Sequence, residues 1–139
     1  MPYPDLMVQP FRDELTRLGV SELLTAAAVD EFLRNKAGTA LLVINSVCGC
    51  AAGRARPALR LALERGRRPD RMGTVLAGQD LEATARARSY FAHLPPSSPS
   101  MALFKNGELV FFLPRSAIES REAEAIAAEL AAVFEEHCG

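Results

Sequence analysis

Two cysteines separated by one glycine, Cys48-Gly49-Cys50, are the residues of this sequence best suited to chemistry. They follow an apolar, β-branched run at 40–47 and precede a segment rich in Ala, Leu and Arg at 51–65. A cysteine at such a strand-to-helix junction meets the free backbone N–H groups and the positive dipole end of the helix. Both stabilise the nucleophilic thiolate. The pattern therefore predicts thiol chemistry, with Cys48 the more exposed and more acidic of the two.

The spacing of Cys48 and Cys50 also allows a disulfide between them, because their Cα atoms can lie within the range that a disulfide tolerates. The ring would be small and strained, and strained bridges are easily reduced. Such a bridge fits a transient role better than a structural one. Gly49 lets the backbone turn tightly and leaves space for another chain to approach.

Two other interpretations of these thiols stay open. They could form half of a zinc or iron–sulfur site, but such sites need about four ligands. The remaining candidates, Cys138, His137 and His93, match no zinc-finger spacing. The two thiols could also be buried and inert, although a strand end beside a glycine suits core packing poorly. Cys138 lies near the chain end and off the apolar stripe of the last helix, so we expect it to be exposed, far from Cys48 and dispensable for turnover.

The segments around the cysteines alternate between predicted strands and helices. Strands are expected at 40–47, 73–77, 101–104 and 109–113, and helices at 10–18, 25–36, 51–65, 81–93 and after Ser120. The helical crossover between the first two strands implies parallel pairing, and Asn106-Gly107 predicts a hairpin between the last two. We expect one domain, 1–139, of the α/β class. It has a mixed four-stranded sheet flanked by helices and an N-terminal helical extension, and 20–24 could add a short edge strand.

Two prolines are predicted to shape the site. Pro57 lies inside the helix after the cysteines, where its ring removes a donor and clashes with the carbonyl of Gly53. We expect a kink that does not end the helix, because the apolar pattern continues to Leu63. Pro99 follows Ser98 just before a buried strand, where a cis peptide bond can occur. That turn would place backbone groups where a substrate could pair, and an ordinary rigid loop is the alternative.

Composition excludes several classes of partner. The chain has 139 residues, of which 49% are hydrophobic, and a net charge of −1. Such a balance gives no bias toward nucleic acid or anionic membranes, and no apolar run is long enough to suggest a membrane span. The start, 1–11, lacks the pattern of a signal peptide, so we expect a cytoplasmic protein. The arginine-rich stretch 54–71 is either a solvated face or a local positive field near Cys48.

Several segments resemble the bacilliredoxins, a bacterial thioredoxin-like family. They are 43–57, which contains the Cys-Gly-Cys block, then 77–80, 96–103, Pro114-Arg115 and Ile118-Glu119. More distantly, 99–107 looks like the cis-proline and hairpin of thioredoxins, and Pro57 resembles the proline that kinks their active-site helix. The resemblance implies a thioredoxin-like fold over nearly the whole chain.

The resemblance also implies a function, the removal of bacillithiol from mixed disulfides on cytosolic proteins. By matching position, Cys48 is the attacking cysteine, Cys50 the second cysteine and Pro99 the cis-proline. Gly49 and Ser98 would complete the substrate-binding part. No metal or resident cofactor is implied, and bacillithiol is the co-substrate. Reductase and isomerase roles both stay open, as does a non-enzymatic thioredoxin-like adaptor or metal carrier that uses the same thiols.

Overall fold

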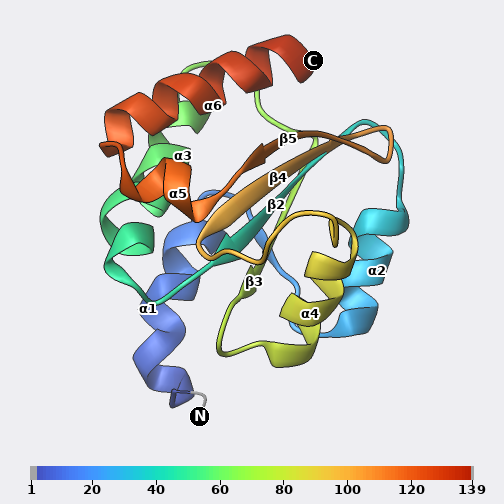
Figure 1. Cartoon of the computed structure of the whole chain (residues 1–139), viewed down its shortest axis with the longest axis vertical. Coiled ribbons are helices and arrows are strands. Elements are labelled where there is room, and N and C mark those ends of the chain that lie inside the picture. Colours follow the sequence, from blue (N-terminus) through green and yellow to red (C-terminus); the bar gives the residue numbers. More distant parts are fainter. Residues whose placement is uncertain (1–2, 139) are drawn as a thin grey trace.

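A mixed five-stranded sheet forms the centre of the structure, a computed structural model that describes residues 3–138 (Figure 1). The strand order is β1-β3-β2-β4-β5, with bounds Ser21–Glu22 for β1, Thr39–Asn45 for β2, Arg71–Leu76 for β3, Ser100–Lys105 for β4 and Glu108–Leu113 for β5. β3 is parallel to β1 and β2, whereas β4 is antiparallel to β2 and β5. The predicted α/β class, mixed sheet and parallel crossover are confirmed.

The predicted number of four strands is wrong by one, because β1 adds a fifth strand at the edge of the sheet. Ser21 and Glu22 pair with Gly73 and Thr74 of β3. Two residues are too few for a hydrophobic pattern of period two to stand out from a loop. The strand lies in the segment 20–24, which the sequence allowed as an edge strand.

Helices cover both faces of this sheet (Figure 1). On one face α3 (Arg56–Leu63) packs beside α6 (Ala123–His137), and on the other α2 (Ala26–Arg34) packs beside α4 (Leu81–Ser89). The predicted N-terminal extension is α1 (Asp5–Thr16), which begins earlier than expected, and a short helix, α5 (Arg115–Glu119), precedes α6. Among residues 3–138, no helix combines the length and apolar character needed to cross a bilayer.

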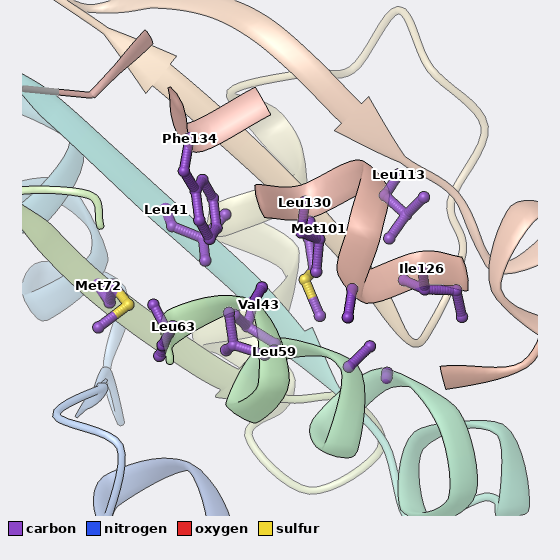
Figure 2. Close-up of a cluster of buried hydrophobic side chains, with 14 of the residues drawn as sticks. Leu41, Val43, Leu59, Leu63, Met72, Met101, Leu113, Ile126, Leu130 and Phe134 are labelled. Atoms are coloured by element: carbon purple, nitrogen blue, oxygen red, sulfur yellow. The ribbon is translucent and has the colours of Figure 1, made fainter. Parts of the chain in front are cut away.

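The central strand β2 is buried along its whole length, as its apolar sequence predicts. Leu41 and Val43 point into one core with side chains of α3 and α6, among them Leu59 and Phe134 (Figure 2). The intervening residues of β2 point into the second core, under α2 and α4. Packing on both faces fixes the strand, and its end at Asn45 therefore gives the following cysteines a rigid base.

The hairpin between β4 and β5 turns at the predicted residues. Asn106 has a φ of 52° and Gly107 a φ of 86°. A type I′ turn needs positive φ at both central positions, which explains why this dipeptide is a strong hairpin signal. Lys105 and Glu108 pair on either side of the turn.

Candidate active site

Cys48 stands at the junction between β2 and the following helical segment, as predicted. Its carbonyl oxygen accepts hydrogen bonds from the backbone N–H groups of Ala51 at 3.1 Å and Ala52 at 3.2 Å. Cys50 lies within the first turn and has helical backbone angles. Both cysteines are partly exposed free thiols, which rules out the interpretation of two fully buried, inert cysteines.

The helix that starts at the cysteines opens with a π-helical turn, η1 (Ala51–Ala55), before it continues as α3. In this turn the N–H of Arg56 donates to the carbonyl of Ala51, five residues earlier. The wider turn accommodates Pro57, which has no N–H and would clash with the carbonyl four residues before it. The backbone stays helical through Ala55 and Arg56. The prediction that Pro57 does not end the helix is confirmed, and the π turn is the form that the irregularity takes.

Opposing influences set the pKa of Cys48. Partial burial raises the pKa, since it penalises the charged form. The hydroxyl of Ser46, the backbone N–H groups of Ala51 and Cys50 and the positive charge of Arg115 lower it. The lowering influences prevail, and the pKa of Cys48 lies below the ordinary value of a thiol. A larger fraction of this sulfur is therefore nucleophilic thiolate near neutral pH.

Arg115 is the functional residue that sequence reasoning missed. It begins α5, and its Nη2 lies 4.0 Å from Sγ of Cys50. Nε donates to Glu119 at 3.1 Å, and this bond, followed by the charges of Cys48 and Cys50, raises the pKa of Arg115. The only sequence signal was its membership in the family-like pair Pro114-Arg115.

Two of the arginines expected to provide a positive field near Cys48, Arg54 and Arg56, are paired with other groups. Nε of Arg54 donates to the carbonyl of Arg121 at 2.7 Å, and the same guanidinium faces Glu122 at 3.6 Å. Arg56 is buried and bonded to Asn45. The positive charge of Arg115, by contrast, lowers the pKa of Cys48.

The loop before β4 reaches the same place. The peptide bond between Ser98 and Pro99 is cis, as predicted. Nη1 of Arg115 donates to the carbonyl of Ser98 at 3.4 Å, and its backbone N–H donates to Oγ of Ser97 at 3.3 Å. Because Arg115 also contacts Cys50, it joins the cis-proline loop to the cysteines.

Gly49 is exposed and lies between the cysteines in a helical conformation that any residue can adopt. Apart from the adjacent cysteines and the backbone of its own helical turn, a Cβ atom built there would meet no described atom within 4 Å. The fold therefore does not require glycine for a tight turn at this position. What the structure does provide there is open space.

Cys138 corrects one prediction and supports another. It is only 2% exposed, so the expectation of an exposed thiol is wrong. Its N–H continues the hydrogen bonding of α6 to Phe134, and its side chain packs in the core. Burial raises the pKa of Cys138, and the hydroxyl of Thr39 opposes that shift. Thr39 begins β2, so Cys138 lies at the far end of that strand from Cys48, about 20 Å away at the rise of a strand.

The potential metal ligands are dispersed. Within residues 3–138, no three side chains of His, Cys, Asp or Glu are grouped closely enough to hold a metal ion.

Comparison with known proteins gives a consistent family. The family model described as disulphide isomerase matches residues 3–138. A bacilliredoxin of Koribacter versatilis is 51% identical over 137 residues, which cover 99% of this chain and 94% of the relative. A bacilliredoxin of Halalkalibacterium halodurans is 54% identical over 141 residues, covering 99% of this chain and 98% of the relative. The likeness extends over nearly the full length of both proteins.

Solved structures of thioredoxins share the fold at much lower identity. Thioredoxin of Fasciola hepatica matches with a TM-score of 0.56 at 16% identity, covering 85% of this chain and 99% of that chain. Oxidised thioredoxin from Plasmodium falciparum matches with a TM-score of 0.58 at 14% identity, covering 86% and 99%. These matches establish the thioredoxin fold predicted from the sequence.

Proposed function

Because this chain belongs to the bacilliredoxin family, whose family model is described as disulphide isomerase, we propose that it removes bacillithiol from mixed disulfides on other proteins, with Cys48 as the nucleophile. In general terms the chain is a thiol–disulfide oxidoreductase with a thioredoxin fold. One observation supports the assignment of Cys48 as the nucleophile. Cys48 is a partly exposed thiol with a lowered pKa at the start of a helix. That environment is typical of a cysteine that attacks disulfides.

In the first step the thiolate of Cys48 attacks the bacillithiol sulfur of the mixed disulfide. One S–S bond forms as the other breaks, and the client protein leaves as a thiolate that takes a proton from water. Bacillithiol stays bonded to Cys48 through a new disulfide. No external oxidant or reductant is consumed, because the step exchanges one disulfide for another.

In the second step Cys50, after losing its proton to water, attacks the sulfur of Cys48. Bacillithiol leaves as a free thiol, and Cys48 and Cys50 become joined by a disulfide. Alternatively, an external thiol attacks the bacillithiol sulfur. Cys48 then leaves as a thiolate, the external thiol becomes joined to bacillithiol by a disulfide, and the protein returns directly to its reduced form. The guanidinium of Arg115, 4.0 Å from the sulfur of Cys50, favours negative charge at this place during either transfer.

The substrate is expected to lie over Gly49 and beside the cis-proline loop of Ser98 and Pro99. A side chain at Gly49 would meet no atom of another part of the described chain, so the surface at this residue is open. Ser98 is partly exposed, and its carbonyl contacts Arg115. We expect an extended client segment to pair with the backbone of this loop. The reaction needs a pool of reduced thiol, so we propose the cytoplasm as its compartment.

The proposal is tested with a client protein that carries one bacillithiol mixed disulfide. Release of the client thiol is followed for the wild type, Cys48→Ser and Cys50→Ser, with bacillithiol present as the external thiol. We expect no release above background with Cys48→Ser and retained release with Cys50→Ser. Equal rates for the wild type and Cys48→Ser would refute the proposal. A client with scrambled internal disulfides, assayed in parallel, distinguishes isomerase from reductase activity.

A further inference from the structure

Arg56 is a buried charge beside the candidate active site, and the mechanism above does not use it. Its side chain is 1% exposed and lies between α1 and the start of α3. The guanidinium carbon is 5.0 Å from the ring centre of Phe11, and Nε is 3.1 Å from a carboxylate oxygen of Glu14. Burying a charge is costly unless it is well paired. A buried arginine at this place therefore calls for a physical reason.

The pairing of Arg56 is incomplete. Nη2 and Nε have no hydrogen-bond partner with suitable geometry among the described residues, although Nε is close to Glu14. Buried polar atoms without partners are uncommon and destabilise the fold. A methionine of similar length would avoid this cost. Stability alone therefore does not explain an arginine at this position. Its third guanidinium nitrogen, Nη1, indicates another role.

That nitrogen, Nη1, holds the two residues that end β2 and lead to Cys48. It donates to Oδ1 of Asn45 and to the carbonyl of Ser46, each at 2.9 Å. Oδ1 of Asn45 also accepts the N–H of Ser46 at 2.9 Å, and Nδ2 donates to the carbonyl of Phe11 at 3.1 Å. The peptide groups on both sides of Ser46 are fixed by this network.

Ser46 in turn contacts Cys48. Its Oγ accepts the backbone N–H of Cys48 at 3.2 Å, which holds the hydroxyl beside this residue, and the hydroxyl lowers the pKa of Cys48. A hydroxyl can stabilise a thiolate only while it stays within hydrogen-bond reach. The placement of Ser46 therefore matters for the reactive form of Cys48.

We propose that Arg56 is a positioning residue for the active site. Its hydrogen bonds to Asn45 and Ser46 keep the Ser46 hydroxyl beside the sulfur of Cys48. Helix α1 takes part, because it supplies Phe11 and Glu14 to the guanidinium. This inference rests on the assignment of Cys48 as the nucleophile in the proposed function.

Arg56 acts through position and not through its charge. Its charge faces Glu14, whereas the positive charge that acts on Cys48 comes from Arg115 of α5. The other ionisable groups at the site are Cys50, on the same turn, and Glu119, which pairs with Arg115. Substitution of Arg56 should therefore no longer change the pKa of Cys48 once the Ser46 hydroxyl is removed.

The test follows alkylation of Cys48 by iodoacetamide across a pH series, with the labelled peptide identified by mass. Arg56→Met is compared with Arg60→Met, a matched control one turn further along α3, where the exposed Arg60 pairs with Glu64 at 3.4 Å. We expect Arg56→Met to raise the midpoint of the pH dependence of Cys48 alkylation by about half to one pH unit. The control should keep the wild-type midpoint.

A double-mutant cycle separates positioning from a direct effect. In a Ser46→Ala background, adding Arg56→Met should leave the midpoint where Ser46→Ala alone puts it. Additive shifts would overturn the proposal. Arg56→Lys keeps the charge but loses the planar fork, and we expect an intermediate midpoint. The proposal is also overturned if Arg56→Met keeps the wild-type midpoint of Cys48 alkylation. If the methionine variant does not fold, a wild-type midpoint with Arg56→Lys overturns it instead. The readout needs neither client nor bacillithiol, so it stands apart from the test of the proposed function.

Discussion

The pKa of Cys48 depends on neighbours from three parts of the chain. Burial disfavours its thiolate, whereas Ser46 before it, the amides of the first helical turn after it and Arg115 from α5 favour it. The local part of this arrangement could be predicted, because a strand followed by Cys-Gly-Cys and a helix is visible in the sequence. Arg115 could not, because no local pattern shows that α5 folds back over the cysteines.

The charge of Arg115 should be measurable in the pH dependence of Cys48. Arg115→Met removes an influence that lowers the pKa, so the pKa rises and the thiolate fraction near pH 7 falls. We expect iodoacetamide labelling of Cys48 at pH 7 to slow by a factor of about 3 to 10. Added salt should slow the wild type more than the variant, because an exposed charge is screened. Arg68→Met, at an exposed position, is the control, and an unchanged rate with Arg115→Met would contradict the assignment.

Cys138 should behave as a core residue. Because it is buried and its pKa is raised, native protein should be labelled at Cys48 long before Cys138. Cys138→Ser places a hydroxyl in an apolar core and should lower the free energy of unfolding by about 1–3 kcal/mol. Urea denaturation measures this change.

Turnover provides the second check on Cys138, since the thiol lies at the far end of β2 from Cys48. Release of client thiol by Cys138→Ser should stay near the wild-type rate when assayed well below its unfolding temperature. A loss approaching that of Cys48→Ser would place Cys138 in the reaction, against the geometry.

At the scale of elements, the π turn and Pro57 form one unit. Pro57→Ala supplies a backbone N–H that can reach the carbonyl of Gly53, so the segment can close into a regular α-helix. We expect the new amide at position 57 to be protected from hydrogen exchange, and the free energy of unfolding to stay level or rise by up to about 3 kcal/mol.

The reactivity of Cys48 should change with that turn, because the amides of Cys50 and Ala51 move when the π turn closes. We expect the midpoint of Cys48 alkylation to shift relative to Pro95→Ala, which changes an exposed loop proline. An amide at position 57 that exchanges freely would show that Pro57 does not cause the π turn.

The helices and strands that could be predicted are those whose own sequence determines their structure. β2 was predictable because seven consecutive residues are buried on both faces, and the hairpin because Asn106-Gly107 has its own turn preference. β1 and α5 are short, with two and five residues, and they depend on partners distant in sequence. The wider turn of η1 could not be predicted, since a kink would also have accommodated Pro57.

At the scale of the whole molecule, α1 is joined to the end of the sheet that carries the cysteines. Arg12 forms two hydrogen bonds with Asp80 at 2.7 and 2.9 Å, and these side chains are only 13% and 8% exposed. Asp80 also accepts the N–H of Leu76, the last residue of β3. The N-terminal helix is therefore an integral part of the fold.

Breaking this pair should cost much more than breaking a surface pair. Arg12→Met leaves the Asp80 carboxylate largely buried without its cation and should lower the free energy of unfolding by about 3 kcal/mol. Arg34→Met is the matched control, because Arg34 is 70% exposed and lies 3.6 Å from Asp30. The control should change stability by less than about 1 kcal/mol. Equal effects in urea denaturation would contradict the role given to α1.

The transfer of bacillithiol to Cys48 is the central step of the proposed reaction, and it can be observed directly. The Cys50→Ser variant is mixed with a client that carries a bacillithiol mixed disulfide, quenched with acid, digested and analysed by mass spectrometry. We expect bacillithiol on the peptide that contains Cys48, in an amount equal to the client thiol released. Client protein bonded to Cys48 in place of bacillithiol, or an adduct on Cys138 with Cys48 unmodified, would contradict it.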